Sequence, residues 1–305
     1  MNKTNKKSLR KRMWRQRELF IMLVPGLLFY LIFRYGPMFG LAIAFKDYSP
    51  FLGVLKSPWA GLKHFEKFFS NADVWRLTFN TLRLGVLQLV IEFPLTIAFA
   101  VILNEVQNMR CKKAYQTISY LPSFLSLVII CSIFKDLFSV DGVINQMIVQ
   151  LGGNVIHFNG DPKFYLFIYI LSDLWGGLGS GAIVYLAALS GVDQNLYEAA
   201  KLDGCSRIKM IRYISIPSIM PTIVTMFLLR VGNIIRITPD KTLLFYNDLT
   251  LETADIIGSY VYRVGITNKS YSFGSAVGLL ESALAAVILI AANKICERAT
   301  GSSLW

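Results

Sequence analysis

Residue types that commonly do chemistry are sparse in this chain. The two histidines, His64 and His157, lie far apart and have no serine or carboxylate partner at a recognisable spacing. The four cysteines form no CxxC pair, and neither residue type shows metal-ligand spacing. We therefore expect no catalytic site, no metal site and no disulfide framework, and we expect that the chain is not an enzyme.

Charged side chains within or beside long apolar segments are the remaining source of candidates, and we select six of them: Arg83, Glu92, Asp173, Arg230, Arg236 and Glu281. A charge within a bilayer is costly, so it tends to face a cavity or a partner. Arg83 and Arg236 lie near segment ends, where a long side chain can reach the membrane surface. Arg230 and Glu281 lie deeper. They could pair with each other, or they could line a polar path together with Asn233.

The composition indicates a membrane protein. Of 305 residues, 54% are hydrophobic and only 16% are charged, whereas an average soluble domain carries about 25% charged residues. A helix needs about 20 mostly apolar residues to cross a bilayer, and six segments qualify: 19–45, 84–103, 114–134, 164–192, 214–235 and 273–293. The sequence thus predicts an all-α polytopic membrane protein with six transmembrane helices in residues 19–293, between a basic tail at 1–18 and a second tail at 294–305.

The distribution of Lys and Arg predicts the orientation. The tail 1–18 alone carries eight of these residues, and its side of the predicted membrane carries more of them than the opposite side does. By the positive-inside rule, both termini are expected in the cytoplasm. The net charge of +12 is then explained by topology and by anionic lipid, and no nucleic-acid partner is expected.

One predicted cytoplasmic loop, residues 191–217, carries a specific pattern. Asp193 or Asn195 can cap a short helix, and Glu198 is expected in its first turn, where a negative charge complements the helix dipole. Gly204 is expected to end this helix, because the left-handed residue that follows a helix is usually glycine.

A second short helix is expected after the glycine, with Ile214 on its apolar face and Pro217 at the re-entry to the membrane. The small residues Ala199 and Ala200 permit a partner surface to approach closely. Two interpretations are possible for this helix pair: a compact protruding motif that binds a partner, or an amphipathic pair that lies on the lipid surface. Pro217 and Pro221 predict a bend in the next span, which is either a hinge or a packed kink.

The loop resembles a known signature. The cytoplasmic loop of permease subunits of binding-protein-dependent ATP-binding-cassette (ABC) importers reads Glu-Ala-Ala, three residues, Gly, nine residues, Ile-x-Leu-Pro. Here it stands as Glu198-Ala199-Ala200, Gly204 and Ile214-Ser215-Ile216-Pro217, with Ile216 as a conservative departure from Leu. Further segments are similar to carbohydrate-uptake permeases of the maltose-transporter type, in the LplB-like branch: 36–48, 59–65, 103–106, 116–122, 260–263 and 304–305.

The resemblance implies a mechanism and partners. The loop would dock on a cytoplasmic ATPase through the coupling residues Glu198, Ala199, Ala200, Asp203, Gly204, Ile214 and Pro217. The implied partners are two ATPase subunits, a second homologous permease, an extracytoplasmic solute-binding protein, and an oligosaccharide or polysaccharide fragment as substrate, in a bacterial cell membrane. ATP and Mg would bind to the ATPase, since the chain has no G-x-x-x-x-G-K-S/T motif and needs no cofactor of its own.

The resemblance also implies a path for a sugar. Asp173 with Trp175 resembles a sugar-contact pair, because an aromatic face stacks on a pyranose while a carboxylate binds hydroxyls. Alternatively, the tryptophan is packed or faces lipid. The path would continue through Arg230, Asn233 and Glu281.

Other features of the sequence leave alternatives open. Gly177 and Gly181, four residues apart, predict close helix packing. The chain could instead import a non-sugar solute with the help of ATP. It could also be a self-sufficient secondary transporter, although no internal repeat of the kind that such a protein would show is recognisable.

Overall fold

The computed structural model describes residues 14–301 and 303, and this part of the chain is helical apart from its loops. One isolated antiparallel bridge joins Lys46 and Trp59 there. Helices are expected in a bilayer because each satisfies its own backbone hydrogen bonds. The prediction of an all-α membrane protein is confirmed, while residues 1–13 of the basic tail, and Leu304 with Trp305, lie outside the described residues.

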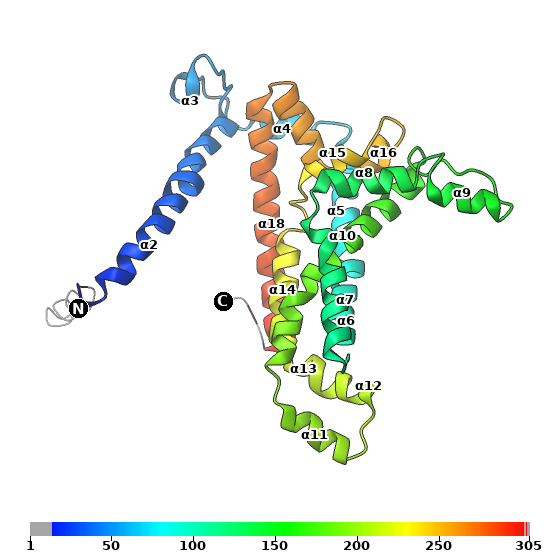
Figure 1. The fold of residues 1–305 in the computed structure, drawn as a ribbon. Coiled ribbons are helices and arrows are strands. Elements are labelled where there is room, and N and C mark those ends of the chain that lie inside the picture. Colours follow the sequence, from blue (N-terminus) through cyan, green and yellow to red (C-terminus); the bar gives the residue numbers. More distant parts are fainter. Residues whose placement is uncertain (1–13, 302, 304–305) are drawn as a thin grey trace.

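The first apolar segment forms an arm that stands away from the other helices (Figure 1). It runs without a break over Arg17–Phe45, as α2 (Arg17–Tyr30), η1 (Leu31–Tyr35) and η2 (Gly36–Phe45). No residue of α2 is buried, whereas η2 packs against the last helix of the chain. The apolar surface of the arm is therefore free to meet lipid or another chain.

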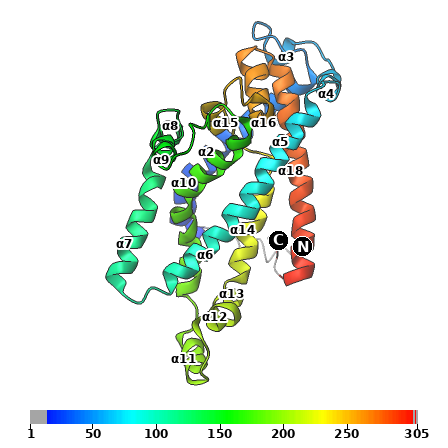
Figure 2. The same cartoon turned by 90° about the vertical axis from the view of Figure 1, so that its right-hand side faces the viewer.

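Three further long helices form the body of the molecule, as Figures 1 and 2 show. The first of them, Val74–Asn104, consists of α5 (Val74–Leu87), η3 (Gln88–Glu92) and α6 (Phe93–Asn104). The others are α10 (Pro162–Ser190) and α18 (Tyr271–Thr300). With the arm, the described residues thus contain four unbroken helices that are long and apolar enough to cross a membrane.

The two remaining predicted spans are bent. Met109–Phe124 and Leu127–Leu137 meet at 99°, and Arg207–Ser218 and Met220–Gly232 meet at 65°. Each bent pair can count as one span, which gives up to six. The predicted span over 114–134 falls on the first bent pair and contains its bend. The elements of the two pairs are α7 (Met109–Tyr120), η4 (Leu121–Phe124), α8 (Leu127–Leu137), α12 (Arg207–Met210), η5 (Ile211–Ser215), α13 (Ile216–Ser218) and α14 (Met220–Gly232).

Local chemistry explains both bends. Pro122 lies in η4, and the Ser126 hydroxyl accepts a hydrogen bond from the Ile129 amide at 3.3 Å, so a new helix begins there in a new direction. The second bend falls at Ile219, between two prolines, and Ile219 is 1% exposed in a cluster that includes Phe93. Tight packing at this position favours the reading of a packed kink over that of a free hinge.

Short helices lie at both ends of the body. One end carries α3, α4, α9 and α16, and the other carries α11 and α12 (Figures 1 and 2). The arm begins and α18 ends toward the end that carries α11 and α12. The remaining bounds are α3 (Gly53–Lys56), α4 (Lys63–Phe69), α9 (Val143–Gln150), α11 (Gln194–Leu202), α15 (Pro239–Phe245), α16 (Leu251–Ala254), α17 (Ile257–Val261) and η6 (Tyr262–Thr267).

Glycines let α10 approach its neighbours closely. A Cβ on Gly179 would collide with the backbone oxygen of Ser119 on α7, and one on Gly181 would lie 3.1 Å from a methyl of Thr96 on α6. Gly177 faces open space. Close packing on this glycine segment is thus present, but through Gly179 and Gly181, and the predicted role of Gly177 is wrong.

Candidate functional site

Two places hold most of the predicted functional residues: the loop around α11 and a cavity in the body. In the loop, the Asp193 carboxylate accepts a hydrogen bond from the Asn195 amide at 3.0 Å and so caps α11. This confirms the first of the two predicted caps. Glu198 lies in the second turn, and its predicted place in the first turn is wrong, because the helix begins at Gln194. Its exposed carboxylate is free for a partner.

Helix α11 ends at the glycine turn that the sequence predicts. Gly204 has φ of +73°, and two hydrogen bonds close the motif: the Cys205 amide donates to the Ala200 carbonyl at 2.9 Å, and the Gly204 amide donates to the Lys201 carbonyl at 3.1 Å. This is a Schellman motif, which only glycine enters without strain. The chain therefore turns sharply at Gly204.

The outer surface of this turn is apolar as well as charged. Leu202 is 90% exposed and Ile208 is 78% exposed, on either side of the turn, and Ala199 and Asp203 are exposed beside them. Two large apolar side chains held in solvent by a rigid turn are typical of a docking surface. Ile214 is half-buried in η5, and Pro217 lies in α13, so these two residues connect the turn to the body and are not part of its tip.

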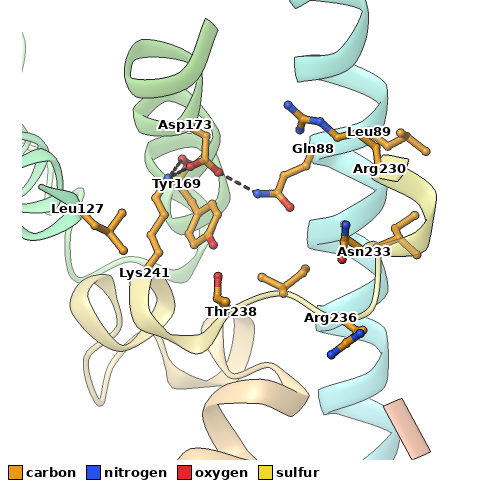
Figure 3. A pocket seen from close by; sticks show the side chains of 13 residues that line it. Gln88, Leu89, Leu127, Tyr169, Asp173, Arg230, Asn233, Arg236, Thr238 and Lys241 are labelled. Carbon is orange, nitrogen blue, oxygen red and sulfur yellow. Dashed lines mark hydrogen bonds and ion pairs between the residues drawn. The ribbon is translucent and has the colours of Figure 1, made fainter. Parts of the chain in front are cut away.

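The cavity lies between α5, η3, α10, α14 and α15 and has a volume of about 290 Å³. Figure 3 shows the polar side chains that point into it from these different elements. Its polar lining consists of Gln88, Tyr169, Asp173, Arg230, Asn233, Arg236, Thr238 and Lys241. Three of the five predicted path residues, Asp173, Arg230 and Asn233, therefore meet at one place.

Asp173 is held on one side of the cavity by two partners (Figure 3). The Lys241 ammonium pairs with its carboxylate and also donates to the Tyr169 carbonyl at 2.9 Å, and the Gln88 amide donates to Asp173 at 2.9 Å. Lys241 also lies 4.1 Å from the centre of the Tyr169 ring, within the range of a cation–π contact. The Lys241 side chain is only 6% exposed. Lys241 is not among the residues predicted from the sequence; its only signal there is a lone lysine before the apolar run Leu243-Leu244-Phe245.

Arg230 pairs with Glu92 and not with Glu281. Its guanidinium donates to the Glu92 carboxylate at 2.9 Å, and the Glu92 side chain is 8% exposed. The alternative pairing of Arg230 with Glu281 is wrong, because Glu281 lines a separate, mainly apolar cavity of about 180 Å³ with residues such as Phe69 and Leu280. Glu281 therefore does not line the cavity that Arg230 lines.

Asp173 and Trp175 do not form the predicted sugar-contact pair. Residues two apart on a helix point in different directions, and only Asp173 lines the cavity. The Trp175 ring packs against Phe134 at 5.8 Å between ring centres. Because 41% of Trp175 is also exposed, the alternative of a packed or lipid-facing tryptophan agrees with the structure.

The charges at the cavity do not balance. Three cations, Arg230, Arg236 and Lys241, face two carboxylates, Glu92 and Asp173. Both carboxylates are already paired, and among the described residues no hydrogen bond or ion pair is seen for the exposed Arg236. The Glu281 carboxylate of a neighbouring cavity interacts with the Arg236 charge through space, but among the described residues it makes no hydrogen bond or ion pair with it. The exposed guanidinium can therefore still bind an anionic group.

Comparison with known proteins gives the family. The model of the family described as "Binding-protein-dependent transport system inner membrane component" matches residues 92–301, which include both the α11 loop and the cavity residues of α10, α14 and α15. The chain belongs to this family. It is therefore a membrane-embedded permease of an ABC transport system and not an enzyme. This assignment argues against a self-sufficient secondary transporter.

The relatives match over nearly their full length. Protein LplB of Bacillus subtilis strain 168 is 42% identical over 93% of this chain and 90% of its own length. The polygalacturonan/rhamnogalacturonan transport system permease protein YteP of the same strain is 39% identical, over 97% of this chain and 92% of its own. A crystal structure of a bacterial alginate ABC transporter, in complex with its alginate pentasaccharide-bound periplasmic protein, holds a chain that is 37% identical. It matches with a TM-score of 0.88 and covers 96% of this chain and 99% of that one.

Proposed function

We propose that this permease is one membrane subunit of an ATP-driven, binding-protein-dependent importer of acidic oligosaccharides or polysaccharide fragments. The observation that carries the acidic specificity is the free guanidinium of Arg236 in a cavity where cations outnumber carboxylates. The names of two similar transporters, for polygalacturonan/rhamnogalacturonan and for alginate, support the same class of substrate. A uronate group would meet Arg236, while Asn233 and Gln88 offer amides to sugar hydroxyls.

ATP and Mg would bind to two cytoplasmic ATPase subunits, because this chain has no phosphate-binding motif of its own. A second homologous permease would complete the path. A solute-binding protein would dock at the extracytoplasmic end, which carries α3, α4, α9 and α16. The eight cations of tail 1–18, and the position of the start of α2 and the end of α18 near the α11 end, support a cytoplasmic location of both termini in a bacterial cell membrane.

The α11 turn would be the ATPase contact. Its tip offers the exposed carboxylate of Glu198, the small side chain of Ala199, and the apolar side chains of Leu202 and Ile208. Apolar residues inside a charged rim are the usual composition of a protein interface. When the ATPases close, they would move this turn and so switch the permease between its inward-facing and outward-facing states.

Replacing Arg236 with glutamine is expected to lower the uptake of a galacturonate oligosaccharide about tenfold, because a hydrogen bond to a charged group contributes about 1.5–3 kcal/mol and each 1.4 kcal/mol is about tenfold. The measurement is ATP-driven uptake into vesicles that contain the permease, its partner permease and its ATPases, together with the binding protein. Arg236→Lys keeps the charge and should retain most of the uptake.

Arg83→Gln is the matched control, since Arg83 is also an exposed arginine but does not line the cavity. We expect this variant to transport like the wild type. Wild-type uptake by Arg236→Gln would contradict the proposed uronate contact, and so would an equal loss in the glutamine and lysine variants.

A further inference from the structure

Helix α11 is attached loosely to the rest of the permease. None of its residues is buried. A polar cavity of about 410 Å³ lies between it and the ends of α6 and α10, with Asn104, Ser190 and Tyr197 among the lining residues. Because this space is not filled by side chains, a displacement of α11 cannot pass to the body through close packing along the helix.

One contact bridges the gap. The Tyr197 hydroxyl lies 2.9 Å from the hydroxyl of Ser215 in η5. Apart from the cap at Asp193, this is the only side-chain hydrogen bond seen between α11 and another segment in the part of the chain that the structure describes. A tyrosine ring is rigid and moves about only two side-chain torsions, so it can hold a fixed distance between the two elements.

The inner end of this contact is firmly anchored. Ser215 is 1% exposed, and it lies in a π-helical turn, a form that is frequent at functional sites. Four residues later, the Ile219 amide donates to the Ser215 carbonyl at 3.3 Å, and the buried Ile219 belongs to the same apolar cluster as Phe93 of α6, at the bend that opens α14. Arg230, on α14, reaches Glu92 at 2.9 Å and lines the cavity. A continuous series of contacts thus leads from Tyr197 to the cavity.

We propose that Tyr197, through its hydrogen bond to Ser215, is the positioning residue that transmits the movement of α11 to α14 and Arg230. This inference rests on the proposed function, in which ATPases move α11. Removal of either hydroxyl leaves the ATPase contact at Glu198, Leu202 and Ile208 in place, but it lets α11 move without α14. The expected effect is fewer sugar molecules transported for each ATP hydrolysed.

The test uses Tyr197→Phe and Ser215→Ala in the complete transporter, reconstituted in vesicles with its ATPases, partner permease and binding protein. Uptake and ATP hydrolysis are measured together. Each single variant should lower the ratio of sugar transported to ATP hydrolysed about threefold to tenfold, which is the scale of one lost hydrogen bond. The double variant should be no worse than either single one, because both remove the same contact.

Two further variants separate transmission from a merely structural role. Ser215→Thr keeps a hydroxyl and should retain the ratio. Tyr213→Phe removes a hydroxyl from an exposed tyrosine of η5 that makes no hydrogen bond seen among the described residues, and it should behave like the wild type. A purely structural defect would lower uptake and ATP hydrolysis together and leave their ratio unchanged.

Wild-type ratios in both Tyr197→Phe and Ser215→Ala would overturn the role of this hydrogen bond, and so would additive losses in the double variant. These results leave the proposed function intact, because the wild type still couples uptake to ATP. Absence of ATP-driven uptake in the wild-type assembly would instead contradict the proposed function, and the transmission role with it.

Discussion

Replacement of Gly204 by valine is expected to uncouple ATP hydrolysis from uptake while membrane insertion stays normal. Gly204 has φ of +73°, a conformation that costs an L-residue about 1–2 kcal/mol and a β-branched residue more. The variant must strain or give up the two hydrogen bonds that close the turn, and Leu202 and Ile208 would then be displaced from each other. We expect uptake to fall by about tenfold or more, since each 1.4 kcal/mol is about tenfold.

The measurement compares uptake, ATPase co-purification and membrane insertion in Gly204→Ala, Gly204→Val and a matched control. Gly191→Ala is that control, because it lies in the same loop with φ of −86° and an added Cβ would make only an ordinary contact, at 3.5 Å. The control should transport normally, and the loss should increase from alanine to valine at position 204. Normal uptake by Gly204→Val would refute the role of the turn.

Replacement of Arg263 by methionine should cause a large loss of stability. Asp255 is 1% exposed, and its carboxylate pairs with the Arg263 guanidinium at 2.6 Å. The hydrogen bonds to Asp255 raise the pKa of the Arg263 guanidinium, which therefore stays charged. Methionine would leave a buried carboxylate with only the Ser259 hydroxyl as a side-chain donor, at 2.8 Å. Breaking a buried pair in this way costs about 3–5 kcal/mol.

Unfolding of the purified chain in detergent measures this effect. Arg83→Met serves for comparison, since exposed substitutions usually change the free energy of unfolding by no more than about 0.5 kcal/mol. If Arg263→Met and Arg83→Met have the same free energy of unfolding, the pair of Asp255 and Arg263 does not stabilise the protein, and this prediction is wrong. In the structure, this pair joins the end of α16 to η6, just before α18, so its loss should also loosen the end opposite α11.

The sequence was sufficient for features that are encoded locally. Apolar length alone predicted the arm, the α5–α6 helix, α10 and α18, because membrane helices follow from hydropathy. The cap at Asp193 and the stop at Gly204 were predicted because each depends on a few neighbouring residues. The misplacement of Glu198 arose from the choice between Asp193 and Asn195 as the cap, which decides the turn in which Glu198 falls.

Features that depend on tertiary contacts could not be predicted from the sequence. Hydropathy does not report direction, so the 99° bend after Phe124 was missed. Arg230 and its partner Glu92 are 138 residues apart, and no spacing rule connects them. Lys241 lies in a helix of only seven residues, and its role emerges only when α15 packs beside α10. Trp175 points away from Asp173 because residues two apart on a helix face different directions. The predicted sugar-contact pair did not take this into account.

The most direct test of the account is sugar uptake by reconstituted vesicles with and without the ATPase subunits. We expect oligosaccharide transport only when the ATPases and ATP are present on the side of α11. The partner permease and the binding protein are included in both measurements. Uptake by this chain without any ATPase would contradict this mechanism, because transport would then not depend on an ATPase that docks on the rigid turn at Gly204.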